Sequence, residues 1–267
     1  MPELPEVETI RRDLLPHLVG ARILSVWTSG KPLHMNRPID VRALRRARGQ
    51  ILALRRHGKY LTIDVEGGSV IVHLGMSGSL SVTEPGPKAA HTHVVWRLDT
   101  GRELRYVDPR RFGQVTTRPP EDVGIDPFDR TFTVARFSAL LARSKRAVKP
   151  FLLDQSQVAG IGNIYASEAL FSAGIHPDSR ADRLGEDARR ALWRAVRDVL
   201  AAGIRNRGTT LRNYRDGKGR EGRNQRRLRV YGRDGEPCVR CGGVVRRSVH
   251  QGRATYFCPT CQIRPTR

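Results

Sequence analysis

Four cysteines near the carboxyl end constrain the fold of this chain more than any other feature. They form two Cys-x2-Cys pairs separated by 16 residues, at Cys238, Cys241, Cys258 and Cys261. Two such pairs on tight turns can place four thiolates tetrahedrally around zinc, each at about 2.3 Å. The alternative is two disulfides, but nothing marks the chain as secreted, and cytosolic thiols stay reduced. The spacing predicts one structural Zn2+ ion, because four cysteine ligands leave no open position for water.

The segment between the two cysteine pairs has the pattern of a β-hairpin. Val244-Val245 and Thr255-Tyr256-Phe257 flank a turn at Gly252, as the two strands of a hairpin would. Three arginines are expected to project from it: Arg246, Arg247 and Arg253. A basic hairpin stapled by zinc can lie on nucleic acid.

The charge of the chain points to a polyanionic partner. The 267 residues include 48 Lys and Arg against 26 Asp and Glu, a net charge of +22, and Gly203–Arg267 alone carries +13 of it. Solubility does not need so much charge. Only six of the basic residues are lysine, and the guanidinium group is the better bidentate ligand for phosphate. We therefore expect nucleic acid as the partner rather than an anionic membrane surface.

The sequence gives no sign of a membrane segment. No apolar run approaches the roughly 20 residues that span a bilayer. The amino-terminal stretch is acidic and lacks the apolar core of a signal peptide. We expect a cytosolic protein without a membrane partner.

Apolar periodicity predicts a strand-rich first half. Residues 3–18 have helical spacing and end before Gly20. From Ile23 to about Thr117 the pattern changes to short strands, with a hairpin signal at residues 99–101. The clearest strands are expected at 51–54, 60–63, 69–72, 93–98 and 104–107. Antiparallel strands without crossover helices indicate a β-sandwich.

The second half is predicted to be helical. Helical periods cover 134–142, 148–155, 163–173 and 186–202, and Gly208–Gly222, with four glycines, is expected to be a mobile loop. The fold class is therefore α+β. We expect a β-sandwich domain at 1–117, a linker at 118–131, a helical domain at 132–229 and a zinc finger at 230–267.

The chain starts Met-Pro-Glu-Leu-Pro-Glu, and this start can carry chemistry. Removal of Met1 would leave Pro2 with a free secondary amine, and an α-amino group has a pKa of roughly 7.7–8.0. Such an amine attacking a sugar aldehyde carbon gives a cationic iminium, which acidifies the adjacent C–H bond. Glu3 and Glu6 are i, i+3 neighbours beside it. The alternative is that Pro5 and the acidic residues simply begin a helix.

A glycine-rich loop precedes one predicted helix. Residues 159–163 read Ala-Gly-Ile-Gly-Asn, and Asn163 opens the helix. Glycines allow a ligand to approach the backbone, and N–H groups at a helix start bind anions. We expect a DNA phosphate here, although Gly-x-Gly before a helix is often only a turn.

Long motifs in this sequence resemble the formamidopyrimidine-DNA glycosylases. They are MPELPEVET at the start, HLGMSG at 73–78, DPRRFG at 108–113, VAGIGNIYASEALF at 158–171, YGRDGEPC at 231–238 and GRATYFCPTC at 252–261. The resemblance implies an amino-terminal β-sandwich, then a helix–two-turn–helix domain with a lesion-capping loop and a zinc finger. It implies a base excision repair enzyme that removes 8-oxoguanine and formamidopyrimidines and then cuts the abasic strand by β,δ-elimination, as an AP lyase.

The resemblance also assigns catalytic roles by position. Pro2 would be the nucleophile at C1′, Glu3 the acid that protonates the deoxyribose ring, and Glu6 a residue that holds the amine or assists proton transfer. Lys59 would donate a proton in β-elimination, although without the resemblance it would pass for a solvent-exposed lysine at a strand edge. Arg253 would grip phosphate and serve δ-elimination.

Further positions match DNA contacts of the family. Met76, Arg110 and Phe112 match the side chains that fill the gap left by an extruded base, because an enzyme acting at C1′ must take the nucleotide out of the stack. The alternative for Met76 and Phe112 is ordinary core, but both lie in glycine-flanked loops. The remaining matches are backbone contacts at His91, Lys149 and Asn163.

One position departs from the family pattern, and two rival functions remain. Family members usually carry an aromatic residue before Gln225, where this chain has Asn224; asparagine can bond a base edge but stacks poorly. The first rival is the related endonuclease VIII group, which acts on oxidised pyrimidines and typically starts MPEGPE. The second is a non-catalytic zinc-finger DNA-binding protein. The resemblance implies a monomer acting on double-stranded DNA with oxidised bases or abasic sites, in a bacterial-type cytoplasm with the nucleoid.

Overall fold

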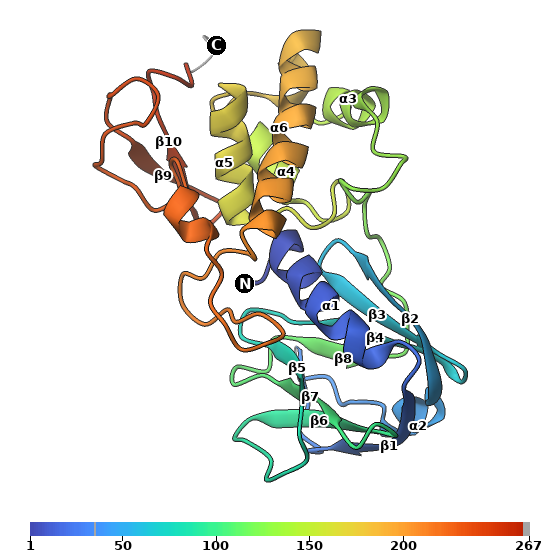
Figure 1. Cartoon of the computed structure of the whole chain (residues 1–267). Helices are drawn as coiled ribbons and strands as arrows, with labels where there is room; N and C mark the ends of the chain where they lie inside the picture. Colours follow the sequence, from blue (N-terminus) through green and yellow to red (C-terminus); the bar gives the residue numbers. More distant parts are fainter. Residues whose placement is uncertain (35, 264–267) are drawn as a thin grey trace. The chain divides into compact units, whose positions relative to one another are not determined.

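The computed structural model describes residues 1–34 and 36–263 and divides into two compact units (Figure 1). Unit 1 comprises Met1–Glu121 together with Ile204–Gln225, and unit 2 comprises Asp122–Gly203 together with Arg226–Arg267. The chain therefore returns to unit 1 after the helices of unit 2. The domain boundaries expected from sequence stay predictions, and the last four residues of the expected zinc finger, 264–267, lie outside the described residues.

Unit 1 is built on antiparallel strands with one long helix. Its helices are α1 (Leu4–Leu18) and α2 (Val41–Arg46), and its strands are β1 (Arg22–Thr28), β2 (Gly49–His57), β3 (Tyr60–Val65), β4 (Gly68–His73), β5 (Ser79–Thr83), β6 (Thr92–Leu98), β7 (Glu103–Val107) and β8 (Gln114–Thr116). The strands are ordered β5-β7-β6-β1-β2-β3-β4-β8. All five strands that we predicted from periodicity are confirmed, as β2, β3, β4, β6 and β7.

The strands form two four-stranded halves, which makes the predicted sandwich. β1 and β2 join the halves through only two residue pairs, Arg22 with Gln50 and Ile23 with Gly49. Apolar side chains from both halves share one buried core: Ile23, Val26, Val94, Trp96, Leu104 and Tyr106 from one, Ile51, Leu54, Leu61, Ile63, Val70, Val72 and Val115 from the other. Val7, Ile10 and Leu14 of α1 complete this core. The hydrophobic face of each half is thereby removed from water.

Local residues explain where the elements of unit 1 begin and end. Pro5 lies in the first turn of α1, where its missing N–H costs nothing. The helix ends at Leu18, just before Gly20, whose φ of 91° is left-handed. β6 and β7 are joined at the predicted hairpin, where Gly101 has a φ of 79°.

Unit 2 combines four helices with a two-stranded sheet. The helices are α3 (Val134–Ala142), α4 (Val148–Leu153), α5 (Asn163–Ala173) and α6 (Glu186–Arg205), whose last two residues belong to unit 1. The short 3-10 helices are η1 (Ala181–Arg183) and η2 (Asn224–Arg227), which begins in unit 1, and the strands are β9 (Arg246–His250) and β10 (Arg253–Phe257). The predicted helices are confirmed, with α4 two residues shorter and α6 three residues longer than expected.

The β9–β10 hairpin matches the sequence prediction closely. His250 pairs with Arg253 across a two-residue turn. Gln251 and Gly252 both have positive φ, 48° and 73°, as a type I′ turn requires. The arginines at 246, 247 and 253 are exposed as predicted.

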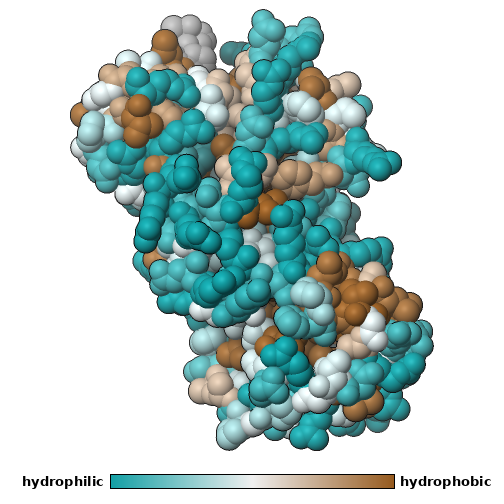
Figure 2. Space-filling model, in the orientation of Figure 1, coloured by the Kyte–Doolittle hydropathy of each residue, from teal (hydrophilic) through white to brown (hydrophobic). Residues whose placement is uncertain are grey.

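Apolar side chains are mostly enclosed, and the face of the molecule in Figure 2 is largely hydrophilic. Exposed apolar side chains include Leu15 on α1, Val19 directly after this helix and Leu52 on β2. Among the described residues, none of the helices combines the length and the apolar character that crossing a bilayer would demand.

Candidate active site and zinc centre

The start of α1 gathers the residues to which we assigned chemistry. Pro2 is buried directly before the helix, and Glu3 is the N-cap residue, 3% exposed. The Glu6 Oε2 atom accepts a hydrogen bond from the backbone N–H of Glu3 at 2.8 Å, the arrangement of a capping box. These residues therefore do begin a helix, and the same geometry places two buried carboxylates beside Pro2.

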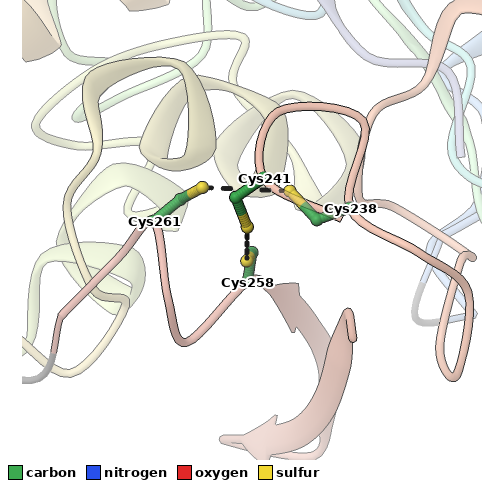
Figure 3. Close-up of side chains that lie close together, drawn as sticks. All are labelled: Cys238, Cys241, Cys258 and Cys261. Carbon is green, nitrogen blue, oxygen red and sulfur yellow. Dashed lines mark hydrogen bonds between the residues drawn. The ribbon is translucent and has the colours of Figure 1, made fainter. Parts of the chain in front are cut away.

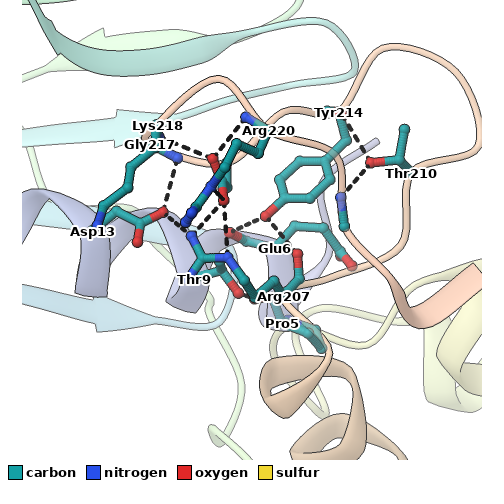
Figure 4. Close-up of polar contacts among 12 residues, drawn as sticks. Pro5, Glu6, Thr9, Asp13, Arg207, Thr210, Tyr214, Gly217, Lys218 and Arg220 are labelled. Carbon is teal, nitrogen blue, oxygen red and sulfur yellow. Dashed lines mark hydrogen bonds and ion pairs between the residues drawn. The ribbon is translucent and has the colours of Figure 1, made fainter.

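The other carboxylate oxygen of Glu6 contacts a distant segment of unit 1. Glu6 Oε1 accepts a hydrogen bond from the Thr209 N–H at 2.7 Å, and Glu6 is only 1% exposed. The Tyr214 hydroxyl donates to the Arg207 carbonyl at 3.2 Å and lies 3.5 Å from the Glu6 carbonyl (Figure 4). Burial, with the nearby Glu6 charge, raises the pKa of Tyr214. Sequence analysis had no signal for Thr209 or Tyr214.

Lys59 is buried in the turn between β2 and β3. Gly58 and Lys59 form a two-residue connection between His57 and Tyr60, and Lys59 is 5% exposed. The turn is tied to α1 through Arg56, whose Nε lies 3.1 Å from Glu8 Oε2 and whose Nη1 donates to the Gly58 carbonyl at 3.2 Å. The alternative that Lys59 is a solvent-exposed lysine at a strand edge is therefore wrong, because the side chain is buried. Glu8 and Arg56 were not found from sequence.

Glu8 is held as a carboxylate by three arginines. Burial raises the pKa of Glu8, but hydrogen bonds from Arg11 and Arg12 and the charges of Arg11 and Arg56 outweigh it and lower the pKa to about 2. Glu8 Oε2 lies 2.9 Å from Arg11 Nε, and Glu8 Oε1 lies 2.8 Å from Arg12 Nε. The cluster fastens α1 to the strand that leads to Lys59.

Replacing Glu8 with glutamine is expected to destabilise the protein by about 2 kcal/mol at pH 7, because a pKa lowered on folding stabilises the ionised folded state. That contribution is complete above the unfolded pKa of about 4.5 and disappears as pH falls through about 2. Urea unfolding of the unchanged protein and of Glu8→Gln, each at pH 7 and pH 3, measures the difference in their free energies of unfolding. The exposed Glu186, paired with Arg190 on α6, is a matched control whose change to glutamine should cost less than about 0.5 kcal/mol. An equal loss from Glu8→Gln at both pH values would contradict the ionic explanation.

His73 lies at the end of β4 and shares the surroundings of Lys59. Burial, together with the charges of Lys59 and His34, lowers the pKa of His73 to about 4. Its ring contacts the Tyr60 ring with centroids 4.8 Å apart. His73 is therefore neutral near pH 7 and adds no positive charge beside the lysine.

Met76, Arg110 and Phe112 lie on two loops of unit 1 that touch through their backbones. A Cβ atom on Gly75 would lie 2.4 Å from the Gly113 nitrogen, so only glycine permits this approach. Met76 and Phe112 are 39% and 42% exposed, and the Arg110 guanidinium lies 4.6 Å from the centre of the Phe112 ring. The alternative that these two side chains are ordinary core is wrong.

Asp108 organises these loops. It is fully buried, and its carboxylate accepts hydrogen bonds from the Ser77 hydroxyl at 2.5 Å, the Tyr106 hydroxyl at 3.0 Å and the Gly113 N–H at 2.8 Å. The motif at 108–113 therefore contains its own anchor, which sequence analysis missed. His91 is exposed, has a φ of 63°, and lies beside Asp108 in space: its carbonyl accepts a hydrogen bond from the Asp108 N–H at 3.0 Å.

Lys149 and Asn163 both bind the β10 strand beside Arg253. The Lys149 ammonium donates to the Ala254 carbonyl at 2.9 Å and to the Thr255 hydroxyl at 2.7 Å, and Lys149 is completely buried. The Asn163 amide donates to the same carbonyl at 2.8 Å. In this structure both side chains position the hairpin that exposes Arg253. Their DNA contacts stay predictions.

The glycine-rich loop before α5 is closely packed. Gly160 has a φ of 95°, and its N–H donates to Gln155 Oε1 at 3.0 Å. Residues 159–162 are buried. That N–H is therefore occupied within the protein, and the phosphate site at this helix start stays a prediction.

The four cysteines converge on one point of unit 2 (Figure 3). Their sulfur atoms all lie within 4.8 Å of one another, with Cys238 and Cys261 3.9 Å apart and Cys241 and Cys258 3.5 Å apart. A tetrahedron with ligands at about 2.3 Å from zinc has sulfur–sulfur edges of about 3.8 Å, whereas a disulfide needs about 2.05 Å. The geometry therefore fits one structural zinc ion, as predicted, and excludes disulfides among these four residues.

Comparison with known families accounts for three successive parts of the chain. Residues 1–115 match the formamidopyrimidine-DNA glycosylase N-terminal domain, residues 123–215 match the H2TH domain of the same glycosylases, and residues 235–263 match a zinc finger found in FPG and IleRS. The chain belongs to the formamidopyrimidine-DNA glycosylase family. A formamidopyrimidine-DNA glycosylase of Heliobacterium modesticaldum is 44% identical to it over 278 residues, covering 98% of this chain and all of that one.

Solved structures of formamidopyrimidine-DNA glycosylases share the whole fold. The Lactococcus lactis protein in complex with DNA containing an abasic site is 32% identical, with a TM-score of 0.87 and coverage of 98% of this chain and 100% of that one. A MutM protein in complex with DNA containing carbocyclic 8-oxo-G is 33% identical, with a TM-score of 0.88 and the same coverage. The expected α+β architecture and the zinc finger are therefore confirmed.

At the one departure from the glycosylase pattern, the side chain is engaged within unit 1. Asn224 is 5% exposed, its amide nitrogen donates to the Thr209 hydroxyl at 2.9 Å, and its amide oxygen accepts from Asn206 at 3.2 Å. Asn224 thus fixes the base of the segment that follows α6. In this conformation it offers no amide group to a base edge.

Proposed function

We propose that this protein is a bifunctional DNA glycosylase and AP lyase that excises oxidised purines, chiefly 8-oxoguanine and formamidopyrimidines, in base excision repair. The observation that carries the proposal is the buried pair of carboxylates, Glu3 and Glu6, around Pro2 at the start of α1. Both acids cap α1, and the same burial keeps them next to the amine that removal of Met1 would free. The DNA complexes of related glycosylases support the same function.

The chemistry would proceed through Pro2 once Met1 is removed. The Pro2 nitrogen forms a bond to C1′ while the N-glycosidic bond breaks, and the base leaves with a proton. Glu3 protonates the ring oxygen, so that the C1′–O4′ bond opens to an iminium. Loss of a C2′ proton then expels the 3′ phosphate, with Lys59 as a proton donor. A second elimination, served by Arg253, expels the 5′ phosphate.

The zinc hairpin and the arginine excess would hold the DNA. Arg246, Arg247 and Arg253 are exposed on β9 and β10, where each can form bidentate contacts with phosphate. Met76, Arg110 and Phe112 would fill the gap left by the extruded base, since two exposed apolar side chains can replace lost stacking. Arg110, which lies beside Phe112, can donate a hydrogen bond to the base of the opposite strand that has lost its partner.

Borohydride trapping tests the proposal directly. The protein is incubated with a duplex carrying 8-oxoguanine opposite cytosine, reduced, digested and analysed by mass spectrometry. An adduct on Pro2 is the expected result. An adduct only with an oxidised pyrimidine would move the protein to the endonuclease VIII group. No adduct with any lesion or abasic site, from chain with Met1 removed, would leave a DNA-binding protein.

Changing Glu3 to glutamine is expected to slow 8-oxoguanine excision by about 10²- to 10⁴-fold, because general acid catalysis contributes that much. Binding to abasic DNA should remain close to that of the unchanged protein. Single-turnover excision and fluorescence anisotropy measure the two quantities. A Glu3→Gln protein with unaltered excision would remove the assigned proton donor from the mechanism.

Two further parts of the proposal concern the working state of the protein. We infer that the protein acts as a monomer, since each assigned catalytic residue is supplied by one chain. We also infer that it acts on DNA in the cytoplasm. Light scattering with and without a short duplex should give one chain per particle. A dimer at working concentration would contradict the first part.

A further inference from the structure

Helix α1 carries a polar stripe in addition to its apolar face. Glu6, Thr9 and Asp13 follow one another at helical spacing, so they share one side of the helix. They are 1%, 2% and 6% exposed. The segment Arg207–Gly222, which we call the clamp loop, supplies hydrogen-bond partners to this stripe (Figure 4).

Arg207 joins the helix to the loop. Its Nη2 atom donates to Asp13 Oδ2 at 2.5 Å, and its guanidinium also donates to Asp216, with Nε 2.9 Å from Asp216 Oδ2. The Asp216 side chain is completely buried, and its other oxygen accepts the N–H groups of Lys218 and Arg220, both at 2.9 Å. One guanidinium therefore bridges two buried carboxylates, one on α1 and one in the loop, and the Arg220 Nε lies 3.3 Å from Asp216 as a second cation.

The backbone of the clamp loop is shaped to lie directly on α1. The Gly217 N–H donates to Asp13 Oδ2 at 3.1 Å, and a Cβ at Gly217 would lie 2.7 Å from the Asp13 Cβ. Arg207 itself has a φ of 61°, a left-handed conformation that glycine adopts at lower cost. Arg207 therefore has a strained backbone conformation, and its side chain forms hydrogen bonds with both Asp13 and Asp216.

The loop is connected to the catalytic end of α1 through Glu6. Thr209, two residues after Arg207, donates to Glu6 Oε1 at 2.7 Å, while Glu6 Oε2 accepts from the Glu3 N–H at 2.8 Å. A displacement of the loop would therefore remove the Thr209 hydrogen bond to Glu6 Oε1, while the bond from the Glu3 N–H to Glu6 Oε2 lies within α1 and does not depend on the loop. Asn224 closes the other end of the loop by bonding Thr209.

We propose that Arg207, bridging Asp13 and Asp216, is a positioning residue that holds the clamp loop against the start of α1 and thereby favours substrates that still carry a damaged base. This inference rests on the proposed function. A base attached at C1′ has to be accommodated by the protein beside Pro2 and Glu3, and the clamp loop is the segment bonded to Glu6 there. An abasic sugar presents no base, so its cleavage depends less on the loop.

Arg207→Gln, Arg207→Lys and the control Arg215→Gln test the proposal. Arg215 lies in the same loop, and its ion pair with Glu221 at 3.0 Å is exposed, so the control removes the same charge without touching α1. Three quantities are measured: single-turnover excision of 8-oxoguanine, single-turnover cleavage at a preformed abasic site, and hydrogen exchange of the 208–222 peptide. Thermal unfolding verifies that each variant is folded.

Arg207→Gln is expected to slow 8-oxoguanine excision by about 10²-fold, since a misplacement of about 1 Å can cost that much. Abasic-site cleavage should stay near the wild-type rate, and exchange in 208–222 should accelerate. Arg207→Lys should restore part of the excision rate, and Arg215→Gln should match the wild type. Equal losses in excision and abasic cleavage, or wild-type excision by Arg207→Gln, would overturn the proposal.

Failure of the proposed function would look different. A wild-type protein inactive on both substrates would refute the glycosylase function itself. Hydrogen exchange would still show in that case whether Arg207 holds the loop. If hydrogen exchange in residues 208–222 is unchanged in Arg207→Gln, Arg207 does not hold the clamp loop against α1, whatever the activities are.

Discussion

Blocking the amine of Pro2 with an amino-terminal Gly-Ser extension is expected to abolish borohydride trapping and to reduce excision by more than about 10³-fold, as removal of a catalytic nucleophile does. An amide nitrogen has no basic lone pair for attack on C1′, so no iminium can form. Pro2 itself is buried directly before the N-cap residue of α1. The measurement is single-turnover excision together with mass spectrometry of the amino terminus.

The control for this experiment is the same extension placed after Arg267. That protein retains a free Pro2 amine and should trap DNA like the unextended chain. Both proteins should bind abasic DNA, because the arginines of β9 and β10 are unaltered. An amino-terminally extended protein that still forms a covalent adduct would show that another amine, such as that of Lys59, is the nucleophile.

Loss of the zinc site is expected to be the second large effect. Cys241→Ser should reduce the zinc content from one ion per chain to none and weaken DNA binding by at least about tenfold. The apolar cluster behind the site is small, with Phe171, Val230 and Val245 as its buried members besides two cysteines. Such a cluster cannot order a hairpin by itself, so the exposed arginines lose their fixed positions.

Salt dependence distinguishes this loss from general unfolding. If the intact protein neutralises about five phosphates, log Kd against log salt has a slope of magnitude about 4.5. Each phosphate that the hairpin no longer neutralises should reduce that magnitude by about 1. Val249→Ala on β9, an exposed residue that is not a ligand, is the matched control and should leave zinc content and slope unchanged. A zinc-free Cys241→Ser protein with normal affinity would contradict a role for the hairpin in binding.

The sequence predicted what depends on spacing along the chain. The four sulfur ligands, the hairpin between them, α1 and five of the sandwich strands were all anticipated, because helix and strand periods and Cys-x2-Cys turns involve residues close in sequence. The residues with assigned chemistry came from the resemblance of short motifs to those of the formamidopyrimidine-DNA glycosylases. These residues could therefore be named without coordinates.

Only the tertiary structure decided how those residues are supported. Glu6 meets Thr209 across 203 residues of sequence, and Asp13 meets Arg207 across 194. The segment Gly208–Gly222, whose glycines suggested a mobile loop, is instead hydrogen-bonded along α1. Composition could not reveal this, because the partners of a buried carboxylate are fixed by which elements pack together and not by spacing. The sequence determined the reactive groups and the zinc ligands, and the folded chain determined which distant residues hold them in place.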